Sequence, residues 1–158
     1  MTEGADPDLT RIVVDADVLA GDLLVGGAAR EAMDTIRSHS WLELVVTEEL
    51  LKDAAAVIEA LADPEIADDW RELVGDLVTV VEQPAGDHPA LAAAYRGNAA
   101  QIVSLNKRLR SAEAGANLRE YLDVSVRSPD AFNAVVDPAA IYELAFEDPY
   151  PGPDRASR

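Results

Sequence analysis

The chain of 158 residues contains no cysteine, only two histidines (His39 and His88) and only two lysines. Without cysteine there is no disulfide and no thiolate nucleophile, and two histidines are too few for a histidine-rich metal site. Any metal bound to this protein is therefore expected to be a hard cation held by oxygen atoms.

Long apolar segments are also missing. No stretch approaches the roughly 18 apolar residues that cross a bilayer, and the opening segment MTEGADPDL is acidic, unlike a signal peptide. We therefore expect a cytoplasmic protein without membrane contact. Because 49% of the residues are hydrophobic, the chain can still bury the core of one domain.

Positive charge is scarce, since 13 Lys and Arg residues face 30 Asp and Glu residues and give a net charge of −17. Such a surface repels nucleic acid in dilute buffer. An acidic, lysine-poor and alanine-rich composition is also typical of halophilic proteins such as those of salt-loving archaea, and molar salt shortens the Debye length to about 3 Å. We interpret the charge as halophilic, so net charge alone does not exclude an RNA partner.

Short apolar runs alternate with helical patterns along the whole chain. Strands are predicted over 11–14, 41–46, 77–81, 101–104 and 123–127, with helices between them. This alternation predicts an α/β fold, an α/β/α sandwich around a short central parallel sheet of four to five strands. Right-handed crossovers place the carboxyl ends of all strands at one edge, where ligands bind in such folds.

The predicted organisation is a flexible N-terminus over 1–10, one domain over 11–146 and a disordered tail over 147–158. Within the domain, Thr47 is the expected N-cap of the helix after the second strand. A helix is expected over 111–122, and Pro138 is expected to interrupt the last helical segment.

Polar residues follow the predicted strands. Asp15 and Asp17 follow the first, Asp53 lies early in the helix after the second, Asp87 precedes the helix after the third, and Asn106 follows the fourth. Gathered at one edge, these side chains would form an oxygen cluster suited to Mg²⁺ or Mn²⁺, because clustered carboxylates repel one another without a cation. Such a site supports metal-assisted hydrolysis of a phosphodiester. The alternative is that Asp15 or Asp17 only caps the next helix.

The same segments resemble the PIN-domain family, metal-dependent ribonucleases that include toxins of toxin–antitoxin pairs and RNA-processing nucleases. VVDADVL is similar to the opening D-x-[ND]-x-L motif, and TEELLKD resembles the segment that carries the second acid. Asp87-His88 before PALAAAYRGNA resembles the third acidic region. The resemblance implies catalytic, metal-holding roles for Asp15, Asp53 and Asp87, with Asp17 as a further ligand.

The fourth motif of that family, T-x-[DN] after a short apolar strand, is similar to IVSLNKRL, which matches Ser104 and Asn106 to its polar positions. The resemblance implies a metal-ligand role for Asn106, but an amide is neutral where many members have an acid. The neighbouring basic residues Lys107, Arg108 and Arg110 are predicted, with Ser104, to contact the RNA backbone. Their alternative is a solvated helix start.

Two functions follow from these motifs. The first is a Mg²⁺- or Mn²⁺-dependent endoribonuclease that hydrolyses RNA phosphodiester bonds, with an antitoxin-like protein or a second copy of the chain as further partners. The alternative is a degenerate PIN-like module that acts in protein or RNA interaction. A receiver-like phosphoacceptor fits poorly, because the third predicted strand is followed by Glu82 and no Lys follows the fifth.

Overall fold

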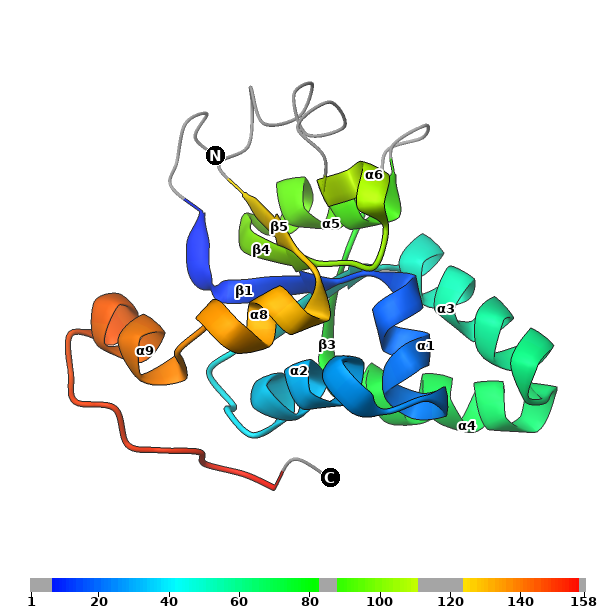
Figure 1. The fold of residues 1–158 in the computed structure, drawn as a ribbon, viewed down its shortest axis with the longest axis horizontal. Helices are drawn as coiled ribbons and strands as arrows, with labels where there is room; N and C mark the ends of the chain where they lie inside the picture. The colour runs from blue at the N-terminus through cyan, green and yellow to red at the C-terminus, as the bar shows by residue number, and fades with distance from the viewer. Residues whose placement is uncertain (1–6, 83–87, 111–123, 157–158) are drawn as a thin grey trace.

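A computed structural model describes residues 7–82, 88–110 and 124–156, and it places them in a five-stranded parallel sheet between helical layers. The sheet order is β3-β2-β1-β4-β5, and every neighbouring pair is parallel. The α/β/α sandwich predicted from the sequence is therefore confirmed. The elements, labelled as in Figure 1, are β1 Asp8–Val14, α1 Ala16–Leu24, α2 Gly27–Arg37, β2 Glu43–Thr47, α3 Glu48–Leu61, α4 Pro64–Gly75, β3 Val78–Val81, α5 Pro89–Gly97, β4 Ala99–Val103, α6 Lys107–Arg110, β5 Ser125–Arg127, α8 Pro129–Val135 and α9 Pro138–Phe146.

The central strand β1 is deeply buried in its second half. Its residues Ile12, Val13 and Val14 are fully buried, and they align with β2 on one side and β4 on the other. Figure 1 shows α5 on one face of the sheet and α1, α2 and α8 on the other, while α3 and α4 form a hairpin at one end. Apolar runs without alternation predict strands covered on both faces, and this is the arrangement observed.

Most helix starts follow the local rules of capping. The hydroxyl of Thr47 accepts a hydrogen bond from the Leu50 amide at 3.1 Å, and Asp63 and Ser128 cap α4 and α8 in the same way. A proline occupies the first turn of α4, α5, α8 and α9, where its missing N–H costs no hydrogen bond. The predicted helix over 111–122 lies outside the described residues.

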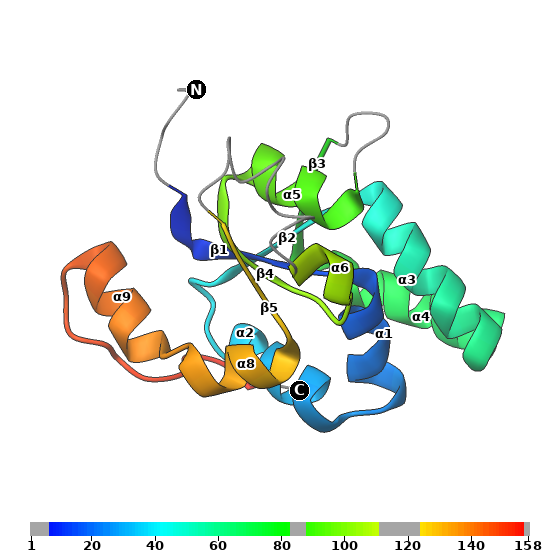
Figure 2. The same ribbon diagram turned by 45° about the horizontal axis from the view of Figure 1, so that its top comes forward.

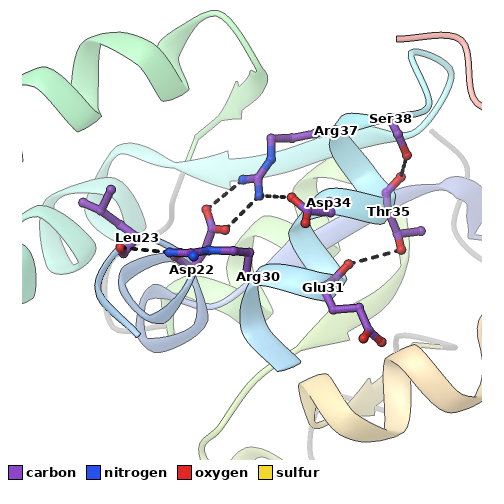
Figure 3. Close-up of polar contacts among 8 residues, drawn as sticks. All are labelled: Asp22, Leu23, Arg30, Glu31, Asp34, Thr35, Arg37 and Ser38. Carbon is purple, nitrogen blue, oxygen red and sulfur yellow. Dashed lines mark hydrogen bonds and ion pairs between the residues drawn. The ribbon is translucent and has the colours of Figure 1, made fainter. Parts of the chain in front are cut away.

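A buried ion pair holds α1 against α2. The guanidinium of Arg37 donates to both carboxylate oxygens of Asp22, at 2.7 and 2.8 Å, and to Asp34 at 2.6 Å (Figure 3). Arg30 donates to the Asp22 carbonyl near the end of α1, which satisfies backbone oxygens that the helix leaves open. The two helices therefore cross through a polar junction in addition to their apolar contacts.

The two chain ends differ from their predictions. Asp8, Leu9 and Thr10 belong to β1, which extends the domain into the segment predicted to be flexible. Residues 147–156, called the C-terminal strap below, follow α9 and run back to the end of α2 (Figure 1). The amide of Asp154 donates to the Ser38 carbonyl at 2.9 Å, and its carboxylate accepts from the Ser40 amide at 2.7 Å. Hydrogen bonds to distant residues thus order a segment whose composition alone indicates a tail.

Among the described residues, no helix is both long and apolar enough to span a membrane.

Candidate functional site at the carboxyl edge of the sheet

The order of strands reverses between β1 and β4, and Asp15 and Ser104 lie at this point. Asp15 follows β1 directly, and its amide donates to the Val103 carbonyl of β4 at 2.9 Å. The Ser104 amide continues the ladder and donates to the Arg127 carbonyl of β5 at 2.9 Å. A crevice forms at such a reversal because the connections leave the sheet in opposite directions, and ligands of open α/β sheets bind there.

Asp15 and Ser104 are joined by a buried hydrogen bond. The Ser104 hydroxyl donates to Asp15 Oδ2 at 2.7 Å, while the Ala16 amide donates to Asp15 Oδ1 at 2.8 Å. Asp15 is 7% exposed and Ser104 is fully buried. Because its hydroxyl is enclosed and directed at Asp15, Ser104 does not present a surface for RNA, and the contact role predicted for it is replaced by a role in orienting Asp15.

Asp17 and Asp53 extend the negative charge from Asp15 to the surface. Both side chains are exposed, Asp17 in the first turn of α1 and Asp53 in the second turn of α3. Partial burial raises the pKa of Asp17, the neighbouring charge of Asp15 raises it further, and Asp53 adds to the same effect. The structure therefore places Asp17 within electrostatic reach of both Asp15 and Asp53.

His88 also acts electrostatically on Asp17, in the direction opposite to the two other aspartates. It is the N-cap of α5, and its Nδ1 accepts a hydrogen bond from the Ala90 amide at 3.1 Å. This bond assigns the ring proton to Nε2 in the neutral imidazole. When the ring of His88 is protonated instead, its positive charge lowers the pKa of Asp17, against the three causes that raise it.

The remaining predicted residues are placed less fully. Asn106 Oδ1 accepts a hydrogen bond from the Leu109 amide at 3.3 Å, so this oxygen caps α6. Lys107 is exposed at the start of α6, four residues after the end of β4. Asp87 and the side chains of Arg108 and Arg110 lie outside the described residues. Among those residues, no group of three His, Cys, Asp or Glu side chains is arranged to hold a metal ion.

Fold and site together define an all-parallel α/β protein with interacting carboxylates at the strand reversal of its sheet. The chain belongs to the family of unknown function DUF7384, whose family model matches residues 6–158. The comparisons with curated proteins and with solved structures gave no match. The family match covers both the sheet and the C-terminal strap.

Proposed function

We propose that this protein is a metal-dependent endoribonuclease that hydrolyses phosphodiester bonds of RNA in the cytoplasm with Mg²⁺ or Mn²⁺. The supporting observation is the position of Asp17 at the carboxyl edge of the sheet, where burial first and the neighbouring charges of Asp15 and Asp53 next raise its pKa. The motif resemblance to PIN domains supports the same reaction. An antitoxin-like inhibitor and a homodimer remain predictions of that resemblance.

The carboxylate oxygens of Asp15, Asp17 and Asp53 are of the chemical type that a hard cation prefers. The described residues alone do not form a group of three metal ligands. Carboxylate oxygens are the ligands that Mg²⁺ and Mn²⁺ prefer, and a dication would relieve the repulsion that raises the pKa of Asp17. Asp15 has one oxygen bonded to Ala16 and the other to Ser104, and each carboxylate oxygen retains a second lone pair. Asp87 is the further ligand that the proposal requires.

Each part of the site has a defined task in this proposal. The bound dication would supply a hydroxide nucleophile at neutral pH and neutralise charge on the phosphate. Asp15 is held in one orientation by the hydroxyl of Ser104, and the exposed ammonium of Lys107 contacts a backbone phosphate next to the cleaved bond. Asp17 and Asp53 would hold the cation together with Asp15 and Asp87.

The test is cleavage of labelled single-stranded RNA with Mn²⁺, with Mg²⁺ and with chelator. The assay needs molar KCl as well as dilute buffer, because the net charge of −17 repels RNA at low salt. Asp53→Asn should abolish metal-dependent cleavage while circular dichroism stays unchanged. Asp68→Asn, the same change at an exposed site of α4, is the matched control and should cut like the original protein. Folded protein that cuts no RNA with either cation at high salt would refute the proposal.

The alternative of a catalytically silent module is favoured by one observation, the use of Asn106 Oδ1 as the cap of α6. An amide attracts a dication less than a carboxylate, and this oxygen already accepts the Leu109 amide. If Asn106→Asp creates metal binding in titration calorimetry and the original protein has none, the silent module is the correct function. If the original protein and the Asn106→Asp variant both bind Mn²⁺ and cut RNA, the protein is a nuclease.

A further inference from the structure

Four aromatic side chains gather at one place, although aromatic residues make up only 5% of the chain. The ring of Trp41 lies 5.1 Å from Tyr142, 5.9 Å from Phe146 and 6.5 Å from Tyr150, measured between centroids. This aromatic cluster holds one of the two tryptophans, one of the two phenylalanines and two of the four tyrosines. Aromatic residues in such density on a surface are typical of protein interfaces.

The cluster is incompletely covered by the rest of the chain. Two of its rings belong to α9, and no residue of α9, which is described over its full length, is buried. Phe146 is 43% exposed, and the rings of Tyr142 and Tyr150 are half-buried. Both ribbon views place α9 at the opposite end of β1 from α1 (Figures 1 and 2). The cluster is therefore a second surface, separate from the carboxyl edge of the sheet.

The charge around the cluster is mainly negative, although Arg155 acts on Asp154 and the ring of His39 contacts Trp41 and Tyr150. No Lys or Arg lies between Arg127 and Arg155, whereas six Asp and Glu residues do. Asp137 and Asp154 both act on Tyr150, because their charges, after burial of the phenol, raise its pKa. Glu143 lies at the Tyr150 amide, with a donor–acceptor distance of 3.5 Å. The exposed carboxylates of Glu147 and Asp148 follow directly at the end of α9.

We propose that the aromatic cluster binds an arginine-bearing segment of a partner protein. Ring faces attract cations, and the planar guanidinium stacks on them better than an ammonium while it bonds a carboxylate with two parallel N–H groups. Phe146 and Tyr142 offer the rings, and Glu143 offers the carboxylate beside them. The occupant that this face fits is therefore cationic, planar in its charged group and extended enough to follow α9.

Other occupants fit the same face less well. A second copy of the chain presents the same carboxylates around the same rings, so two identical faces repel each other before the rings meet. Nucleic acid phosphates meet six acidic residues and no Lys or Arg over residues 128–154 and are repelled as well. Charge complementarity thus selects a basic protein segment.

The test measures binding of a labelled peptide of alternating Arg and Ala, about twelve residues long, by fluorescence anisotropy. The matched ligand replaces each Arg with citrulline, which keeps the shape and removes the charge, and it should not bind. Phe146→Leu should raise the dissociation constant about two- to fivefold, because one ring face at an exposed site is lost. Glu143→Gln should weaken binding by a similar factor while leaving the ring contacts intact.

Two variants control for the strongly acidic surface as a whole. Tyr95→Leu removes an exposed ring from α5, and Glu72→Gln removes an exposed carboxylate from α4. Neither should change peptide binding. Urea midpoints measured in parallel show whether Phe146→Leu still folds, and Glu143→Gln tests the surface without changing a ring.

Three outcomes would overturn the proposal. Equal weakening by the control variants would mean that the peptide binds to the net charge of the whole protein. Equal binding of the citrulline peptide would mean that the face takes an apolar segment. A dimer in sedimentation that Phe146→Leu dissociates would mean that the face joins two copies of the chain.

Discussion

The buried pair between Asp22 and Arg37 provides the sharpest test of the energetics of this fold. The side chain of Asp22 is 9% exposed and that of Arg37 is 17% exposed, and two hydrogen bonds join them at 2.7 and 2.8 Å. Burial by itself lowers the pKa of Arg37, but the hydrogen bonds to Asp22 and Asp34 outweigh burial and raise it. The pair is therefore a stable ion pair with most of its water removed.

Removal of either partner should be costly because the other charge stays buried. Losing one member of a buried pair costs about 3–5 kcal/mol, against a total stability of about 5–15 kcal/mol for a single domain. The cost of Arg37→Met should lie at the upper end of that range, because the buried carboxylate of Asp22 then loses the guanidinium that it pairs with. Asp22→Asn should lie at the lower end, because Asp34 still accepts from Arg37 at 2.6 Å. Asp34→Asn should cost less than about 1 kcal/mol, since its side chain is 34% exposed.

The assay is urea unfolding in molar KCl, followed by circular dichroism, for both single variants and for the double variant Asp22→Leu with Arg37→Met. Buried pairs are screened little by salt, so the cost should persist at high ionic strength. The double variant should recover most of the loss, because it leaves no isolated buried charge. Single variants that each cost under about 1 kcal/mol would refute a desolvated pair at this junction.

Three further changes test separate features of the structure. Gly97→Ala should cost about 1–3 kcal/mol in urea unfolding, because the new Cβ overlaps Cγ1 of Val45 where α5 meets the sheet. Asp17→Asn should raise the melting temperature at neutral pH in chelator. Because folding raises the pKa of Asp17, the native state loses stability as pH rises above 3.8, the ordinary pKa of an aspartate, so the advantage of the variant should vanish below that pH. Ser104→Ala should cost about 1–3 kcal/mol of unfolding free energy, since Oδ2 of the buried Asp15 then loses the hydroxyl that donates to it.

Much of the fold follows from local patterns in the sequence. The helix expected after the third strand, just past Asp87, is observed as α5 over Pro89–Gly97. Proline fits its first turn, and glycine at its last position allows the helix to end close against Val45 of the sheet. The break between α1 and α2 falls at Gly26, whose φ of 89° suits glycine. Thr47 caps α3 as predicted. These features need only residues that are neighbours in sequence.

The C-terminal strap and the aromatic cluster could not be predicted in this way. The strap is held by contacts such as that between His39 and Tyr150, which are 111 positions apart. The Pro-rich, acidic segment from 147 to 156 carries no periodic pattern that indicates docking. One local signal was present, since Tyr142 and Phe146 are four residues apart and so share one side of a helix.

The acidic site was predictable in position but not in detail. Polar residues after parallel strands meet at one edge, so the approach of Asp15 to Ser104 follows from strand order. The sequence does not reveal that Ser104 is enclosed or that Asn106 spends its carbonyl oxygen on the cap of α6. Those outcomes depend on the path of the chain after β4, which no periodic pattern specifies.

Asp15 shows why a helix cap and a functional carboxylate need not be alternatives. One of its oxygens accepts the first amide of α1 and the other accepts the hydroxyl that follows β4, so the same carboxylate starts a helix and spans the strand reversal. Its replacement by Ala would remove both bonds and confuse stability with activity. Asp15→Asn keeps one oxygen for the Ala16 amide and turns a neutral NH₂ toward the hydroxyl of Ser104, which can accept from it. Loss of metal-dependent activity in a variant that melts near the original temperature would therefore assign the charge of Asp15, and not its cap, to function.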